Sequence, residues 1–497
     1  GAGGDDILNG GPGDDVLDGG AGLDLADYSE AAAGAVVNLG LGSAQDGDGG
    51  SDTLVAIEGA IGSAFDDVYT ATGGALNVFA GLAGDDVVNG DGATRLEYDR
   101  GATARIIADL ADGVVAGDAS VGADTVSGVA AIIATAFDDV LFGSDDDPGG
   151  DPNAFESFEG LAGDDVIDGR GGLDHASYTR SSAGVVVSLA DGEATEDGFG
   201  GNDVLFGIEG VDGSAFDDIL EGDANANALS GNAGNDILTG LAGDDVLSGG
   251  LGDDAFDGGA GADTMDGGAG IDSVTYANDG AAIDANLLAG FVIDGNGEVD
   301  SLTAIENLTA TAFDDTLVGN GDANQFNGGA GADTLDGGAG NDVLNGAAGD
   351  DVLIGGLGDD VLNGGAGFDV ADYSSSATAI AVDLPNHMVD DGAGGADTLG
   401  GDIERIVGSN FGDVFILDAV TEIDGGGGFD TIDLSNFAGV ANLNFADGLV
   451  FDGDTLFGVL VGIENATGGA GADILVGDAN ANLLAGGAGD DTISGLL

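Results

Sequence analysis

The feature that most constrains this chain is a nine-residue repeat. From Gly213 the sequence divides into seven consecutive nonapeptides that end at Thr275, and a second run of seven extends from Ala310 to Asp372. Shorter runs of three occupy residues 1–27 and 468–494. The shared pattern is G-G-x-G-x-D-x-U-x, where U is a large apolar residue. Since one such unit cannot bury an apolar face alone, the fixed period predicts a solenoid of stacked units.

The pattern also predicts the local structure of each unit. Its glycines permit the left-handed and tight-turn conformations of a sharp turn. Its last three residues form a short strand in which U points inward. Two nonapeptides then make one coil of 18 residues, with turns joining two parallel sheets. The predicted fold class is all-β: a parallel β-roll or β-solenoid of nonapeptide repeats, with six irregular modules interleaved with the regular runs.

The large negative net charge of the chain predicts that this fold needs a bound cation. The chain has 93 acidic residues against 6 basic ones, a net charge of -87, and 102 glycines that are costly to order. Such a chain is expected to be disordered unless a cation neutralises it. The same charge repels nucleic acid and anionic membranes, so neither is an expected partner. No apolar run approaches the roughly 20 residues that span a bilayer, so no membrane insertion is expected.

Oxygen ligands identify the expected cation. The turns offer main-chain carbonyls and the aspartate at the sixth position, which suit calcium rather than zinc or copper. Isolated matches to the pattern, such as those with Asp67, Asp86 and Asp413, leave a turn-capping role open as the alternative. The candidate calcium ligands in register are Asp6, Asp15, Asp24, Asp165, Asp174, Asp218, Asp236, Asp245, Asp254, Asp263, Asp272, Asp315, Asp333, Asp342, Asp351, Asp360, Asp369, Asp430, Asp473 and Asp491.

A longer module is repeated six times between these runs. Each copy begins with a tyrosine (leucine in the sixth), and most carry a phenylalanine 37 to 39 residues later and a glutamate seven residues before that phenylalanine. We expect these aromatic side chains to fill the core, with carbohydrate stacking as the alternative. We also expect each segment after the tyrosine to form two further coils. The predicted divisions are 1–27, 28–97, 98–177 (a degenerate module with a protruding loop or bend at 144–158), 178–275 (with the run 213–275), 276–372 (with the run 310–372), 373–433, and 434–497 (with the run 468–494).

Four modules contain an acidic loop about 18 residues after the tyrosine, such as D-G-D-G-G-S-D from Asp46. These alternating oxygens around a glycine turn are similar to the first half of an EF-hand loop without its helices. We expect extra calcium sites here, with a solvated surface loop as the alternative. The loop candidates are Asp46, Asp52, Asp197, Asp203, Asp294, Asp300, Asp391 and Asp397, so that the chain would hold roughly 15 to 25 Ca²⁺ in total.

The sequence resembles the repeats-in-toxin (RTX) family, and the likeness extends over essentially the whole chain. The resemblance implies that each calcium lies between one turn and the next turn above it, so that a run of seven repeats supplies about five sites. It also implies export by type I secretion and folding on contact with extracellular calcium. A location outside a bacterial cell or on its surface is therefore expected.

No catalytic motif stands out. The chain has 2 histidines and no H-E-x-x-H, G-x-S-x-G or P-loop pattern, and we expect it not to be an enzyme. The first functional hypothesis is an extracellular structural protein, a rigid rod that assembles into a surface layer or filament. Repeats without evident caps at either end favour head-to-tail or lattice self-association. The alternative is a calcium-dependent folding and secretion module of a larger RTX enzyme, toxin or adhesin.

Overall fold

The computed structural model describes residues 3–73, 76–145, 156–392, 395–417, 421–453 and 455–495. It divides into two compact units, Gly1–Thr264 (unit 1) and Met265–Leu497 (unit 2). Regular structure in the described residues is β-strand except for two short 3-10 turns, η1 (Leu39–Leu41) and η3 (Leu384–Asn386). The all-β prediction is therefore confirmed. Residues 146–155, where a protruding loop or bend is expected, lie outside the described residues.

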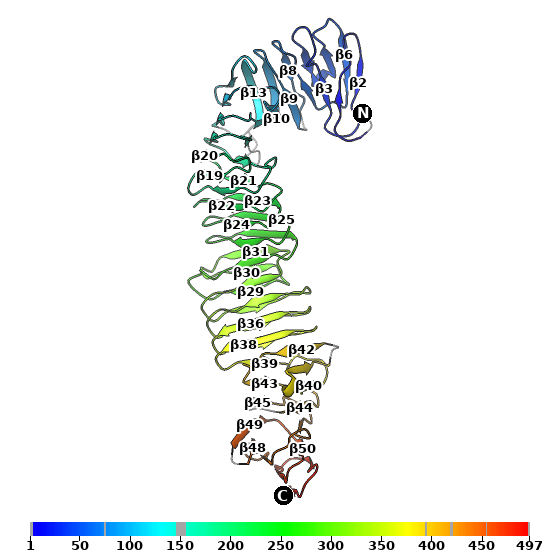
Figure 1. Ribbon diagram of the computed structural model, residues 1–497, viewed down its shortest axis with the longest axis vertical. Coiled ribbons are helices and arrows are strands. Elements are labelled where there is room, and N and C mark those ends of the chain that lie inside the picture. The colour runs from blue at the N-terminus through cyan, green and yellow to red at the C-terminus, as the bar shows by residue number, and fades with distance from the viewer. Residues whose placement is uncertain are drawn as a thin grey trace. The chain divides into compact units, whose positions relative to one another are not determined.

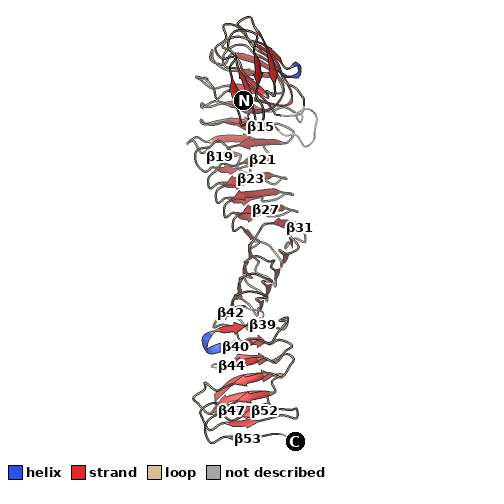
Figure 2. Ribbon diagram, turned by 90° about the vertical axis from the view of Figure 1, so that its right-hand side faces the viewer, coloured by secondary structure: helices blue, strands red, loops and turns tan. Residues whose placement is uncertain are grey.

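Unit 1 is a solenoid with two stacks of short strands (Figures 1 and 2). The first stack is β1 (Ile7–Leu8), β3 (Leu25–Asp27), β7 (Gly59–Ile61), β9 (Asn77–Ala80), β10 (Val87–Glu97), β13 (Ala123–Ile133), β15 (Glu156–Glu159), β17 (Asp174–Ser177), β21 (Gly210–Asp212), β23 (Ala228–Ala233) and β25 (Val246–Leu251). The second contains β2 (Val16–Asp18), β6 (Ser51–Val55), β5 (Ser43–Gln45), β4 (Val36–Asn38), β8 (Val68–Thr70), β12 (Val114–Ala116), β11 (Ile107–Asp109), β14 (Val140–Phe142), β16 (Val166–Asp168), β20 (Asp203–Phe206), β19 (Glu193–Glu196), β18 (Val186–Ser188), β22 (Ile219–Glu221), β24 (Ile237–Thr239) and β26 (Ala255–Asp257), and it includes parts of β10 and β13.

Unit 2 repeats this arrangement. Its first stack is β28 (Ser273–Thr275), β32 (Asn307–Thr309), β34 (Gln325–Asn327), β36 (Val343–Ala348), β38 (Val361–Ala366), β42 (Ala396–Leu399), β41 (Met388–Asp390), β40 (Ala381–Asp383), β44 (Val414–Ile416), β46 (Thr431–Asp433), β50 (Asn465–Thr467) and β52 (Leu483–Ala485). Its second is β31 (Val299–Thr303), β30 (Phe291–Ile293), β29 (Asp284–Asn286), β33 (Thr316–Val318), β35 (Thr334–Asp336), β37 (Val352–Ile354), β39 (Val370–Asp372), β43 (Arg405–Val407), β45 (Thr421–Asp424), β49 (Thr455–Val461), β48 (Leu449–Asp452), β47 (Ala441–Asn444), β51 (Ile474–Val476) and β53 (Thr492–Ser494). The strand β27 (Thr264–Ala269) spans the division between the units.

The register of the regular runs follows from the apolar eighth position. Pairs such as Leu344↔Leu362 in β36 and β38 lie opposite each other in parallel strands 18 residues apart. Both side chains are fully buried, and so is Leu335 in the other stack. The seventh position points outward, where Val343 is 36% exposed. This alternation confirms that U forms the core between the two stacks.

The segments after each tyrosine differ from the expected pair of coils. In the first module β4 pairs antiparallel with β5, and β5 pairs antiparallel with β6. The meander is continuous with the solenoid because β6 pairs parallel with β2 and β4 with β8. A three-stranded antiparallel meander thus replaces regular coils in this segment, and β29 to β31 repeat the arrangement in unit 2.

The module aromatics separate into two groups. Tyr28, Tyr98, Tyr178, Tyr276 and Tyr373 are buried, as expected of core residues. Phe65, Phe137, Phe216, Phe313 and Phe411 are instead 42 to 46% exposed, so core filling is wrong for them. Each phenylalanine occupies the fourth position of its turn, where other repeats carry glycine, and this position faces outward. Among the described residues no helix has the length and apolar character needed to cross a membrane.

Candidate metal sites

The regular turns have two left-handed positions. In the turn that ends at Asp333, Gly329 has φ of +95° and Gly331 has φ of +130°. A side chain at either place would also collide with the turn beneath, since a Cβ on Gly331 would lie 2.4 Å from the carbonyl oxygen of Phe313. The second position tolerates other residues at a cost, as Leu241 with φ of +74° shows. Glycine at the fourth position therefore permits close stacking of one turn on the next.

The sixth-position aspartates form ladders along the edges of the solenoid. The N–H of Asp333 donates to Oδ1 of Asp351 (2.9 Å), and the N–H of Asp351 donates to Oδ1 of Asp369 (3.0 Å). In unit 1 the N–H of Asp236 donates in the same way to Oδ1 of Asp254 (2.8 Å). One carboxylate oxygen of each interior aspartate is thus used by the backbone of the preceding coil.

The second oxygen of many ladder aspartates has no partner. It is buried, and in a folded protein a buried carboxylate oxygen without a donor is costly. At the sixth position of the turn, Oδ2 lacks a hydrogen-bond partner in Asp24, Asp86, Asp165, Asp236, Asp245, Asp333, Asp342, Asp351, Asp360, Asp369, Asp397 and Asp430. All of these side chains are at most 1% exposed.

These unpartnered oxygens face main-chain carbonyls. A Cβ built on Gly240 would lie 2.4 Å from Oδ2 of Asp245 and 2.5 Å from the carbonyl oxygen of Gly258 in the next coil. A Cβ on Gly337 would meet Asp342 and the next carbonyl in the same way. Acceptors that converge without a donor between them suit a cation, and carboxylate plus carbonyl is a calcium donor set. In the part of the chain that is described, no three acidic or histidine side chains gather as a metal cluster, so carbonyl ligands would be needed.

Burial strains the charged form of these carboxylates. Burial, together with the neighbouring carboxylates of Asp218 and Asp254, raises the pKa of Asp236 to about 7. The same causes raise the pKa of Asp86 and of Asp165 to about 8. A cation beside Oδ2 would remove this strain because it favours the ionised form.

The predicted ligands fall into distinct environments. All are buried except Asp6, Asp15 and Asp491, which are partly exposed. Asp6, Asp15, Asp174, Asp254, Asp263, Asp272 and Asp491 belong to the ladders through hydrogen bonds to the adjacent coil. Asp218, Asp315 and Asp473 differ, because both oxygens of each accept N–H or hydroxyl donors from their own and neighbouring segments.

The first aspartate of each acidic loop caps that loop. Oδ1 of Asp46 accepts the N–H groups of Asp48 (2.9 Å) and Gly50 (2.7 Å), and Oδ2 accepts that of Gly13 (3.1 Å). Burial acts to raise the pKa of Asp46, but these donors hold it below its usual range. Oδ1 of Asp197, Asp294 and Asp391 accepts loop N–H groups in the same manner, but Oδ2 of Asp197 is buried without a hydrogen-bond partner.

The second aspartate of each loop instead joins a ladder. Oδ1 of Asp52 accepts the N–H of Asp15 (3.0 Å), and Oδ2 accepts the hydroxyl of Tyr28 (3.1 Å). Asp203 and Asp300 accept Tyr178 and Tyr276 likewise, and Asp397 lies beside Tyr373. The chain therefore resumes the regular turn within the loop.

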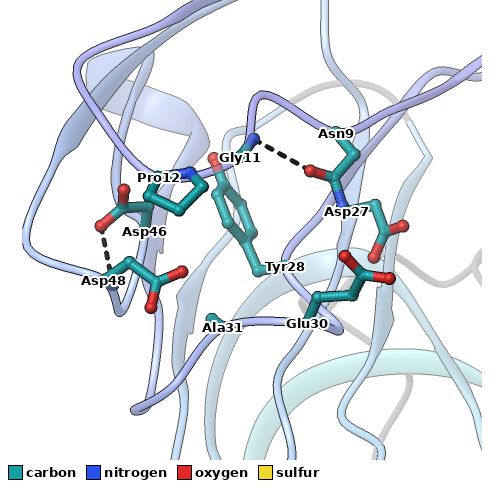
Figure 3. Close-up of a pocket in the computed structure, with 9 residues that line it drawn as sticks. All are labelled: Asn9, Gly11, Pro12, Asp27, Tyr28, Glu30, Ala31, Asp46 and Asp48. Carbon is teal, nitrogen blue, oxygen red and sulfur yellow. Dashed lines mark hydrogen bonds between the residues drawn. The ribbon is translucent and has the colours of Figure 1, made fainter.

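A small acidic pocket lies beside the first loop. Its volume is about 120 Å³, and Asp27, Glu30, Asp46 and Asp48 line it around Tyr28 (Figure 3). The hydrogen bond from the N–H of Asp48 to Asp46 closes one side of it. Every carboxylate oxygen of Asp46 already has a donor, so this pocket differs from the ladder turns.

Sequence reasoning missed three kinds of ladder residue. Asp124 accepts the N–H of Asp86 and the hydroxyl of Tyr98, which makes it the second-module counterpart of Asp52. Its distance from its tyrosine, 26 residues against 24 in the first module, could have found it although its loop keeps only one glycine, Gly122. Asp139 was missed at the turn of the second module. The glutamates before the phenylalanines end ladders: Glu58, Glu209, Glu306, Glu404 and Glu464 each accept the N–H of the aspartate one coil below.

Comparison with known families agrees with this geometry. The profile described as the RTX calcium-binding nonapeptide repeat (4 copies) matches residues 1–26, 155–176, 212–247, 239–274, 309–344, 336–371 and 462–497. A search of curated proteins finds no match. The matched segments contain most of the ladder aspartates, whereas Asp86, Asp397 and Asp430 lie outside them. The chain therefore carries RTX calcium-binding nonapeptide repeats in these segments, which together make up less than half of its residues.

Proposed function

We propose that the chain is a secreted structural protein whose solenoid becomes rigid when calcium binds between successive turns of each ladder. The observation that carries this is the set of buried, unpartnered Oδ2 atoms facing main-chain carbonyls. Calcium supplies the positive charge that these oxygens lack, and the chain supplies the acidic and carbonyl ligands that hold it.

The principal ligands are the interior ladder aspartates. In the second regular run these are Asp333, Asp342, Asp351, Asp360 and Asp369. In the first run Asp236 and Asp245 have the same environment. Aspartates whose two oxygens are already bonded, Asp218 and Asp315, are poor ligands because a cation would displace N–H donors.

Calcium binding and folding are then one event. A chain of net charge -87 with this many buried carboxylates does not hold a compact state without counter-ions. Circular dichroism during a calcium titration tests this: β-type signal is expected to appear cooperatively as calcium is added and to disappear on chelation. A complete β-type spectrum in excess chelator would contradict the proposal.

A structural role outside a bacterial cell fits this chemistry. RTX proteins are typically secreted by bacteria, and millimolar extracellular calcium matches the affinity of extracellular calcium modules, about 10⁻⁴ to 10⁻³ M. Electron microscopy of the chain in calcium tests assembly into a layer or filament. Ordered arrays that dissolve on chelation are expected, whereas particles that stay single at every concentration would favour a module of a larger secreted protein.

A further inference from the structure

We propose that each long ladder begins at a turn that binds no calcium, where a serine or threonine takes the place of the metal. The proposal rests on calcium binding by the interior aspartates and concerns the residues that limit it. Five turns have this form, with serine or threonine at the second position, phenylalanine at the fourth and aspartate at the sixth. They are Ser63 to Asp67, Thr135 to Asp139, Ser214 to Asp218, Thr311 to Asp315 and Ser409 to Asp413.

Hydrogen bonds saturate the aspartate of these turns. At Asp315, Oδ2 accepts the N–H of Thr311 (2.8 Å) and the Thr311 hydroxyl lies within 3.0 Å of both carboxylate oxygens. Oδ1 of Asp315 also accepts the N–H of Ile283 (2.7 Å). Asp333, one coil above, has a donor only on Oδ1. The same ladder therefore holds one carboxylate without need of a cation and, directly above it, one that lacks a partner.

The backbone of these turns also differs. Gly329 and Gly331 occupy the second and fourth positions of the regular turn with φ of +95° and +130°, whereas Thr311 and Phe313 do not have positive φ. In the regular turn these left-handed residues leave carbonyl and carboxylate oxygens facing each other. In the serine or threonine turn the N–H and hydroxyl of the second residue point at the carboxylate instead. Donors aimed at the site oppose a cation there.

The companion ladders begin with a neutral residue. Asn324 stands at the sixth position, where its Oδ1 accepts the N–H of Asn320 (3.0 Å) and its Nδ2 donates to the carbonyl oxygen of Glu306 (3.0 Å). Asn227 repeats this arrangement in unit 1. An amide needs no counter-ion, so both edges of a run start without metal.

The far ends of the ladders are closed as well. Glu404 accepts the N–H of Asp369 and ends one ladder of the second run. In unit 1, Tyr178 donates its hydroxyl to Oδ2 of Asp203, the oxygen that is unpartnered in interior aspartates. Calcium is thereby confined to defined segments of the ladders.

The test is the number of calcium ions bound per full-length chain at saturating calcium, measured by equilibrium dialysis and elemental analysis. The variants are D315N and D333N, which remove the same charge from adjacent coils of one ladder. D333N is expected to lose at least one ion and D315N none. Equal losses in the two variants would overturn the proposal. A wild-type chain without bound calcium, or D333N with full occupancy, would instead contradict the proposed function itself.

If D315N does not fold in calcium, D218N and D236N make the same comparison in unit 1, where Ser214 caps Asp218.

Discussion

Replacing Asp245 with asparagine would separate the contribution of calcium binding from that of the hydrogen bond at Oδ1. Oδ1 of Asp245 accepts the N–H of Asn227 (2.7 Å), and an asparagine oxygen can keep this bond. The new Nδ2 would stand where the unpartnered Oδ2 faces the carbonyl oxygen of Gly258. Asn324 shows that the sixth position accommodates an amide, although there Nδ2 donates to Glu306 in the preceding coil and Oδ1 faces the next coil. Asp245→Asn should therefore preserve the turn and remove its calcium ligand.

The magnitude follows from linkage. With a dissociation constant of about 10⁻⁴ to 10⁻³ M, one ion adds about 1.4 to 2.7 kcal/mol to the free energy of unfolding at roughly 10 mM free calcium. Above the dissociation constant, each ion adds about 1.4 kcal/mol for every tenfold rise in free calcium. Asp245→Asn should lower this slope by the contribution of at least one ion, because the carboxylate lies between two successive turns.

The assay is urea unfolding followed by circular dichroism at several free calcium concentrations. Asp244→Asn is the matched control: Oδ1 of Asp244 accepts the N–H of Ala262 (3.0 Å) at the exposed fifth position. At the fifth position of another turn, Asn235 already makes the same bond, because its Oδ1 accepts the N–H of Asp253. The control removes an equal charge and should leave the calcium slope unchanged. Identical slopes for wild type and Asp245→Asn would refute the assignment of the ladder to calcium.

Three further predictions address charge and backbone. Burial raises the pKa of Asp165 to about 8, so this group binds its proton more tightly in the folded state than in the unfolded state. Without calcium, the fold should therefore be most stable below about pH 4 and should lose stability as the pH rises through about 8. Circular dichroism in chelator would detect this change. A chain that gains no β signal on acidification in chelator would contradict this. Arg180→Gln should destabilise unit 1 by roughly 1 kcal/mol, by the same amount at every free calcium concentration that supports folding, as urea unfolding would show. Gly358→Ala should lower the melting temperature strongly, because Gly358 has φ of +138° and the new Cβ would lie 1.6 Å from the carbonyl oxygen of Gly340. Gly321→Ala should have little effect, because no atom lies within 4 Å of the new Cβ.

The regular part of the fold follows from the sequence because one short pattern states its requirements locally. Glycine at the fourth position, aspartate at the sixth and leucine at the eighth each have one structural purpose, and Leu344, Asp342 and Gly340 lie where the pattern predicts. Position in the pattern also predicts burial, because strand residues alternate between core and solvent.

The irregular modules could not be derived in the same way. A length of about two coils suggests two coils, but β4 to β6 use a comparable length as an antiparallel meander. Antiparallel pairing depends on contacts between strands rather than on a local pattern. Likewise, Asp218 and Asp236 carry the same residue at the same position. Only the structure reveals that Ser214 satisfies one carboxylate and that nothing in the chain satisfies Oδ2 of the other.

Charge compensation connects these differences. Where the nonapeptide register is regular, the buried carboxylates need an external cation. Between residues 95 and 180, where the register is less regular, guanidinium groups lie beside acidic residues: Arg180 lies 3.0 Å from Asp99 and 3.5 Å from Glu159, and Arg95 lies 2.7 Å from Glu97. At the first turn of a long ladder, hydroxyl and N–H donors do the same without charge. Arg95 and Arg180 thus compensate buried acidic groups outside the two regular runs, while Asp86 and Asp165 in the same region keep Oδ2 atoms without a partner.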